Sequence, residues 1–186
     1  MSAYAGIGSQ STPPDILDIM VEFGIQLAER GLTLRSGYAD GADTAFWKGA
    51  SYGHGKQENY VPWPGFNGAP TNDNRFISLN DLPEDVVMIA RDLARHTHPA
   101  WHSCSQGVRK LHTRNMFQVL GRNLDDPVDF VVCWTKNGSG AGGTGQALRL
   151  AKSMNIQIFD LAIPGMIDAL HSYIENEYIN PVGLFD

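Results

Sequence analysis

The chain has 186 residues, of which 42% are hydrophobic, and a formal charge of −6 at pH 7. This length is enough to bury one core and too short for two ordinary domains. The negative charge argues against a protein whose whole surface binds duplex DNA or an anionic membrane. Because the sequence has two cysteines, no secretory leader pattern and no apolar run that could span a bilayer, we expect a cytoplasmic protein with no membrane partner.

Apolar segments with strand and helix periods alternate along the chain. The expected strands are residues 3–9, 32–35, 58–61, 130–134 and 156–159. The expected helices are residues 16–28, 42–50, 84–96, 106–120, 146–154 and 163–178. Strands that alternate with helices pair in parallel, and the helices cover both faces of the sheet. The sequence therefore predicts an α/β protein with a Rossmann-like three-layer parallel sheet of about five strands, flanked by helices.

The segment near residues 64–83 interrupts this alternation. It is rich in proline, glycine and asparagine and shows no helix or strand period. We expect it to be a less regular insertion, or a lid, within one nucleotide-binding domain that spans residues 1–186.

Glycine-rich loops follow the first, second and fourth expected strands. Their candidate ligand-binding residues are Gly6, Gly8, Ser9, Ser36, Gly37, Gly142, Gly143 and Thr144. In open parallel sheets ligands bind beyond the carboxyl ends of the strands. Free amides at a helix N-terminus favour an anion, and the Thr144 hydroxyl could both cap a helix and donate to a phosphate oxygen. The alternative is that these loops are only turns that need positive φ angles.

Asp40 and Asp43 lie in the second of these loops, where a carboxylate would repel a phosphate. One interpretation is that either residue caps the helix that follows. The other is that they accept hydrogen bonds from ribose hydroxyls, as acidic residues do in dinucleotide sites.

Arg114 is the candidate phosphate ligand in the most basic segment of the chain. It shares a helix face with Lys110 and Gln118, and its planar guanidinium suits bidentate contact with oxygens. The alternative is a solvated cationic face that balances nearby aspartates. Asn115 could contact a ligand or cap a backbone group. Trp134, at the end of a strand, could stack on a base.

Four possible metal ligands, His96, His98, His102 and Cys104, occur within nine positions. Their spacing matches no named zinc motif, and Pro99 bends the chain between them. We therefore expect no metal, and expect instead that Trp101 packs and that one histidine lines the ligand pocket or bonds a backbone carbonyl.

Together, Gly6 to Ser9, Ser36 to Asp43 and Gly142 to Thr144 resemble the SLOG superfamily of Rossmann-like nucleotide-binding proteins. The superfamily includes DNA-processing protein A (Smf) and the "lonely guy" (LOG) phosphoribohydrolases, and small phage proteins look similar. The second loop is most similar to DNA-processing protein A, and residues 112–116 and the glycine-threonine loop are similar to LOG. The resemblance implies a nucleotide-binding fold, a phosphate contact at Arg114 and a homodimer.

The sequence departs from LOG after Thr144. The LOG loop continues into glutamates, one of them implicated in cleaving an N-glycosidic bond, whereas here Gly145 and Gln146 follow. Gln146 can hydrogen-bond a ribose or base but cannot act as a general base, so a hydrolase would need Asp40 or Asp43 as its catalytic carboxylate.

We therefore expect a protein that binds a nucleoside monophosphate or an ADP-ribose-like signal for sensing or sequestration, with no cofactor. One alternative is a LOG-like phosphoribohydrolase. The other is a single-stranded DNA-binding module like DNA-processing protein A, although the acidic chain lacks a basic and aromatic strip.

Overall fold

Side chains on the central strands alternate between two separate cores. On β1 (Ala3–Gly6), Ala3 and Ala5 contact one core and Tyr4 contacts the other. On β5 (Phe130–Cys133), Val131 and Cys133 are separated from Phe130 and Val132 in the same way. A strand that is apolar on both faces must be covered on both faces. The sheet therefore requires a helical layer on each side.

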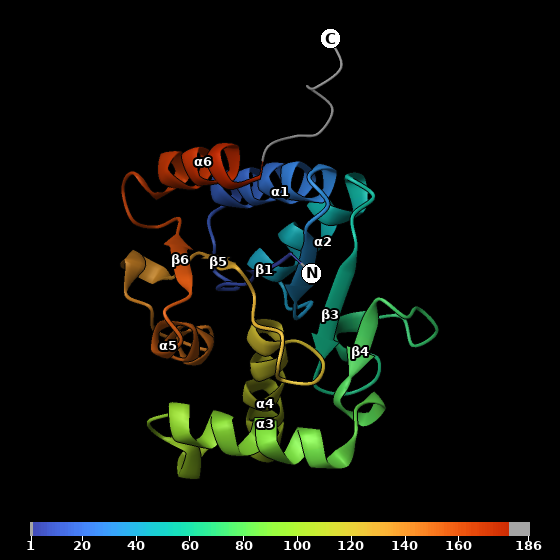
Figure 1. Cartoon of the computed structure of the whole chain (residues 1–186). Helices are drawn as coiled ribbons and strands as arrows, with labels where there is room; N and C mark the ends of the chain where they lie inside the picture. The colour runs from blue at the N-terminus through green and yellow to red at the C-terminus, as the bar shows by residue number, and fades with distance from the viewer. Residues whose placement is uncertain (1, 179–186) are drawn as a thin grey trace.

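The computed structural model describes residues 2–178, and these form six parallel strands in the order β4-β3-β2-β1-β5-β6 (Figure 1). The remaining strands are β2 (Thr33–Ser36), β3 (Gln57–Val61), β4 (Phe76–Ser78) and β6 (Gln157–Asp160). Strand order runs outward from β1 in one direction to β4 and in the other through β5 to β6. This arrangement confirms the expected Rossmann-like α/β fold.

Within the described residues, six α-helices form the outer layers (Figure 1). One face is covered by α1 (Pro14–Glu29), α2 (Ala42–Tyr52) and α6 (Met166–Glu177). The other is covered by α4 (Gln106–Leu120) and α5 (Gly145–Ser153), and α3 (Glu84–Thr97) packs on the outside of α4. No helix in the described range is long and apolar enough to cross a membrane.

The stretch from residue 64 to 83 differs from the sequence prediction. It contains β4, which pairs in parallel with β3 through the Asn59 and Phe76 positions, so the sheet has six strands. Three residues are too few to show a strand period, and the pairing depends on Asn59, whose backbone N–H donates to the Arg75 carbonyl at 2.7 Å. The part of this segment at Phe66 and Asn67 contributes to a cavity described below.

Candidate functional site

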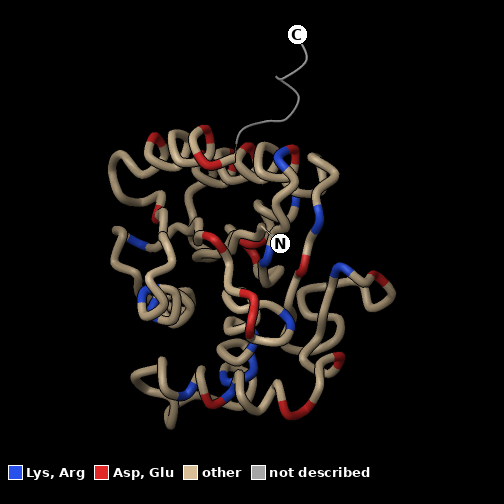
Figure 2. The backbone as a smooth tube through the Cα atoms, in the orientation of Figure 1, with Lys and Arg blue, Asp and Glu red and all other residues tan. Residues whose placement is uncertain are grey.

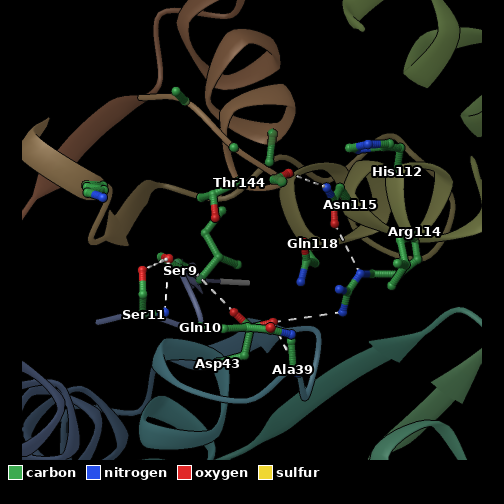
Figure 3. A pocket seen from close by; sticks show the side chains of 18 of the residues that line it. Ser9, Gln10, Ser11, Ala39, Asp43, His112, Arg114, Asn115, Gln118 and Thr144 are labelled. Atoms are coloured by element: carbon green, nitrogen blue, oxygen red, sulfur yellow. Dashed lines mark hydrogen bonds and ion pairs between the residues drawn. The ribbon is translucent and has the colours of Figure 1, made fainter. Parts of the chain in front are cut away.

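A cavity of about 850 Å³ opens at the carboxyl ends of the strands. The loops that follow β1, β2, β3 and β5 line it, together with one side of α4 (Figure 3). β1 lies between β2 and β5, so the direction of the strand order changes between β1 and β5. In doubly wound sheets this change of direction opens a crevice between neighbouring loops, which is where ligands bind.

Eight of the expected binding residues line this cavity. They are Gly8, Ser9, Asp43, Arg114, Asn115, Gly142, Gly143 and Thr144. They come from the loop after β1, the loop before α5, the first turn of α2 and α4, which are far apart in the sequence. The fold therefore brings together, in one cavity, candidate ligand-binding residues that the sequence predicted in the glycine-rich loops and in the basic helix.

Six other expected residues do not line the cavity. They are Gly6, Ser36, Gly37, Asp40, Trp134 and Gln146. Gly6 packs against Phe46, and the buried Ser36 hydroxyl donates to the Gly6 carbonyl at 2.6 Å. Asp40 is exposed, and Trp134 packs on the core that contains α1, α2 and α6.

Arg114 is buried, with 5% of its surface exposed, so the alternative of a solvated cationic face is wrong. Its Nη1 donates to the carbonyls of Gly37 and Tyr60, and its Nε donates to Asn115 Oδ1 at 3.0 Å. The same Nη1 lies 3.8 Å from Asp43 Oδ2. The other terminal nitrogen, Nη2, makes no hydrogen bond with any residue from 2 to 178. Both N–H groups of Nη2, on a rigidly held guanidinium, are thus left for a ligand.

Gly37 positions this guanidinium without entering the cavity. A Cβ atom at Gly37 would lie 1.5 Å from Arg114 Nη1 and 2.4 Å from Gln118 Nε2. Only glycine leaves room there for the Arg114 side chain to reach the loop after β2. Gly37 is therefore required by the position of Arg114, and a direct ligand contact is not needed to explain it.

Asp43 is the single carboxylate among the described residues that line the cavity. It does not cap α2, because the N-cap is Gly41 and no side chain caps it. Its two oxygens accept hydrogen bonds from the backbone N–H groups of Gly8 at 3.2 Å and Ala39 at 3.4 Å. Asp43 therefore links the loops that follow β1 and β2 (Figure 3).

Burial raises the pKa of Asp43 to about 6. The nearby Arg114 and the backbone N–H donors oppose this shift but do not cancel it. Burial also lowers the pKa of Arg114, and the attraction of Asp43 raises it in turn. The cavity thus holds a carboxyl that can change its protonation state near neutral pH beside a guanidinium.

The loop before α5 forms another wall of the cavity. Gly142 has a φ of +78°, whereas Gly143 has no left-handed φ, and a Cβ on either residue would meet no atom within 4 Å. Thr144 occupies the N-cap position of α5, but its side chain makes no capping hydrogen bond, and its φ and ψ angles of −70° and −31° are helical. A capping side chain needs an extended backbone, so the predicted cap is wrong and the Thr144 hydroxyl faces the cavity (Figure 3).

Gln146 does not line the cavity but connects the helices beside it through hydrogen bonds. It is fully buried, and its Nε2 donates to the Ala94 carbonyl and to Thr97 Oγ1, at 3.2 and 3.1 Å. Its Oε1 accepts from Asn115 Nδ2 at 3.2 Å, and Asn115 Nδ2 also donates to the Gly143 carbonyl. The amide therefore joins α3, α4 and α5, and it has no free group to offer to a ribose or base.

Gln118 is a site residue that the sequence did not predict, although it shares a helix face with Arg114. Gln118 is 2% exposed, lines the cavity, and makes no hydrogen bond with any residue in the described range (Figure 3). Its amide atoms are not among the buried atoms that lack a partner, so they are open to the cavity and are candidate ligand contacts. The signal was available in the four-residue spacing from Arg114.

Of the histidines, the one that lines the cavity is His112. His96, His98 and His102 do not, so none of them is the pocket histidine that the sequence led us to expect. His96 instead contacts the Asp92 carbonyl through Nδ1 at 2.7 Å, and Trp101 is buried as expected. Burial, together with a smaller effect of the neighbouring His98, lowers the pKa of His112 to about 4.

A scan of the sequence against protein-family models finds no match, and a search of curated proteins finds none either.

Proposed function

We propose that this protein binds a nucleotide or a nucleotide-derived small molecule, such as a nucleoside monophosphate or an ADP-ribose-like signal, for sensing or sequestration. The observation that carries the proposal is the buried Arg114, which presents an unpaired Nη2 to a large cavity at the carboxyl ends of parallel strands. Nη2 is not among the buried side-chain atoms that lack a partner, so it is open to the cavity, where an anionic ligand can accept its hydrogen bonds.

The loop before α5 supports a phosphate at the same site. Neither its neighbours nor its backbone requires glycine at position 143, because an added Cβ would meet open space. A missing side chain is explained when a ligand approaches the backbone closely. The cavity volume lies within the range of about 300–1,000 Å³ that is typical of small-molecule sites.

Asp43 and Gln118 suggest where the rest of the ligand would lie. A carboxylate accepts hydrogen bonds from ribose hydroxyls but repels a phosphate, so we place the sugar near Asp43 and the phosphate between Arg114 and the glycine loop. The amide of Gln118 can both donate and accept, which suits the polar edge of a base or sugar. The resemblance of the loops to the SLOG superfamily of nucleotide-binding proteins supports a nucleotide as the ligand.

A second candidate function, a LOG-like phosphoribohydrolase, is favoured by the protonation of Asp43. A carboxyl with a pKa of about 6 is suited to general acid or base catalysis near neutral pH. Its two backbone hydrogen bonds also hold it in one orientation. Of the two catalytic candidates from the sequence, only Asp43 lines the cavity, and Asp40 does not.

The deciding experiment incubates the full chain with nucleoside monophosphates, NAD and ADP-ribose, and measures retained ligand and released base by mass spectrometry. Stoichiometric retention of one intact species supports the binding function and identifies the ligand. Catalytic release of free base that disappears in Asp43→Asn would instead make the protein a glycosidic hydrolase. If no species is retained or cleaved, the nucleotide proposal is wrong.

In the same experiment, the variant Gly143→Ala tests whether the ligand lies close to the backbone at position 143. The new methyl group has open space around it, so the variant should fold like the parent chain and retain less ligand. Gly107→Ala is the matched control, because it adds a methyl group to α4 outside the cavity, where the nearest atom is 4.0 Å away.

A further inference from the structure

Three side chains with metal-binding atoms meet where the turn after α3 contacts the first half of α4. They are His98, Cys104 and His112, and one ligand atom from each lies within 4.8 Å of the others. Cys104 Sγ is 3.9 Å from each ring nitrogen of His98, and the centres of the two imidazole rings are 4.3 Å apart. His112 is the member that the sequence analysis did not include, because it lies on a different element from the other two.

The hydrogen-bond network fixes which nitrogen of His112 is available. At one end of the network Arg114 can only donate, so Asn115 Oδ1 accepts and Asn115 Nδ2 donates to Gln146 Oε1. At the other end the Ala94 carbonyl can only accept, which gives the Gln146 amide the same orientation. His112 Nδ1 contacts this Oε1 at 3.2 Å and must therefore carry the proton.

In a neutral imidazole the second nitrogen then bears the free lone pair, so His112 presents an unprotonated Nε2. Metal-bound histidines commonly donate their other N–H to an oxygen acceptor that fixes the ring, and Gln146 Oε1 occupies that position here. This partner of the ring is independent evidence for a ligand role, beyond the proximity of the three side chains.

The turn that carries the other two ligands is anchored to α4. Trp101 is buried, Arg109 Cζ lies 5.7 Å from the centre of its ring, and Arg109 Nε donates to the Trp101 carbonyl at 3.3 Å. His98 and Cys104, on either side of Trp101, are only partly buried. They can therefore adjust around an ion, His98 by releasing the Ala100 N–H that its Nδ1 accepts at 3.1 Å.

We propose that His98, Cys104 and His112 form a Zn²⁺ site with one sulfur and two nitrogen ligands. Thiolate and imidazole are the ligands that Zn²⁺ prefers, and no carboxylate of the described residues belongs to the cluster, which disfavours Mg²⁺ and Ca²⁺. Binding forms one Zn–S and two Zn–N bonds and releases the Cys104 thiol proton to solvent. The fourth position is left for water or another ligand.

This inference goes beyond the proposed nucleotide function and does not depend on it. The two sites are neighbours, because His112 lies next to Asn115 and also lines the cavity (Figure 3). An ion on His112 would therefore lie at the edge of the cavity.

The test is a Co²⁺ titration of the full chain after treatment with a chelator, followed by competition with Zn²⁺. We expect a thiolate-to-cobalt charge-transfer band and intense visible bands of a tetrahedral site, which saturate at one Co²⁺ per chain and disappear when Zn²⁺ is added. Cys104→Ser should remove the charge-transfer band, and His98→Gln should weaken binding about tenfold or more. Both positions are partly exposed, so these variants should still fold.

His102→Gln and His96→Gln are the matched controls. Both residues are exposed histidines of the same segment and lie outside the cluster, so these variants should bind like the parent chain. In addition, Zn²⁺ should raise the Tm of the parent chain and leave the Tm of Cys104→Ser unchanged. Absence of the charge-transfer band in the parent chain, or its survival in Cys104→Ser, would overturn the proposal.

Discussion

At the scale of single residues, the cavity concentrates polar groups that a core would normally exclude. His112, Arg114, Asn115 and Gln118 all line it and are all buried on one helix. Buried polar groups persist when they are hydrogen-bonded or when they serve a ligand. His112 and Asn115 are paired within the protein, whereas Gln118 and Nη2 of Arg114 have no partner among residues 2–178, and these unpaired groups are the ones we assign to ligand binding.

Arg114→Ala should weaken binding of the retained nucleotide by about tenfold or more, because a charge-assisted hydrogen bond contributes about 1.5–3 kcal/mol. The variant should also unfold more easily, since Asp43 loses its buried partner. Isothermal titration calorimetry measures the affinity, and Lys110→Ala is the control, because Lys110 is exposed on the same helix. Unchanged affinity in Arg114→Ala would remove Arg114 from the site.

Asp43 should make the native state less stable as the pH rises. Its pKa is about 6 in the folded protein, whereas the ordinary pKa of an aspartate, which applies to the unfolded chain, is 3.8. Between these values the native state keeps the proton and the unfolded state has lost it, so raising the pH through this window favours unfolding. From about pH 4 to about pH 7 the parent chain should lose about 2 kcal/mol relative to Asp43→Asn, which does not titrate there.

Urea unfolding of both chains at several pH values checks this prediction, because the difference between them isolates Asp43 from the other titrating groups. A constant difference across the window would show that Asp43 ionises at its ordinary pKa.

At the scale of secondary-structure elements, α4 is the central component of the site. Its apolar side chains Met116 and Phe117 pack against the sheet core, and its polar side faces the cavity and α5. Its N-terminus is capped by Ser105, whose hydroxyl accepts from the Val108 N–H at 3.3 Å. The same helix thus carries the candidate phosphate contact Arg114, the unpaired amide of Gln118 and the candidate metal ligand His112.

The edge strand β4 should contribute to stability, which an irregular insertion would not. Phe76 is 8% exposed, and its ring lies 4.8 Å from that of Tyr38 in an edge-to-face contact. Phe76→Ala should lower the free energy of unfolding by about 3 kcal/mol, which is the usual cost of removing a buried aromatic ring. Chemical denaturation measures this, with Thr71→Ala at an exposed position as the control. A loss as small as that of the control would show that β4 is not part of the packed structure.

At the scale of the whole molecule, charge is unevenly distributed (Figure 2). α1 and α6 carry acidic residues and no lysine or arginine, whereas α4 and α5 carry basic residues and no acidic ones. The acidic helices cover one face of the sheet and the basic helices the other. A net charge of −6 therefore coexists with a local basic region beside the cavity.

This distribution leads us to expect no stable complex with single-stranded DNA. A stacking platform needs exposed aromatic rings between basic side chains, and among the described residues Trp63 is the one exposed aromatic side chain near the cavity wall formed by Phe66. A mobility-shift assay with a single-stranded oligonucleotide at low salt should show no retarded band. A band that disappears as salt is raised would favour the DNA-processing alternative.

The expected homodimer stays a prediction. Analytical ultracentrifugation of the full chain tests it, because a dimer sediments faster than a monomer of the same chain.

The sequence by itself determined the fold class and most of the elements, because period-2 and period-3.6 patterns record which local conformation buries the apolar side chains. It also identified three of the four loops that line the cavity, since glycines and small polar residues mark the carboxyl ends of parallel strands, but it did not identify the loop after β3 that contains Phe66 and Asn67.

Only the tertiary structure decided which polar groups remain unpaired. The sequence could not show that Asp43 links two loops, that Gln146 is fully used inside the protein, that β4 pairs at the edge, or that His112 meets His98 and Cys104. Each of these depends on contacts between residues distant in the chain or on different elements, and local patterns carry no information about such contacts.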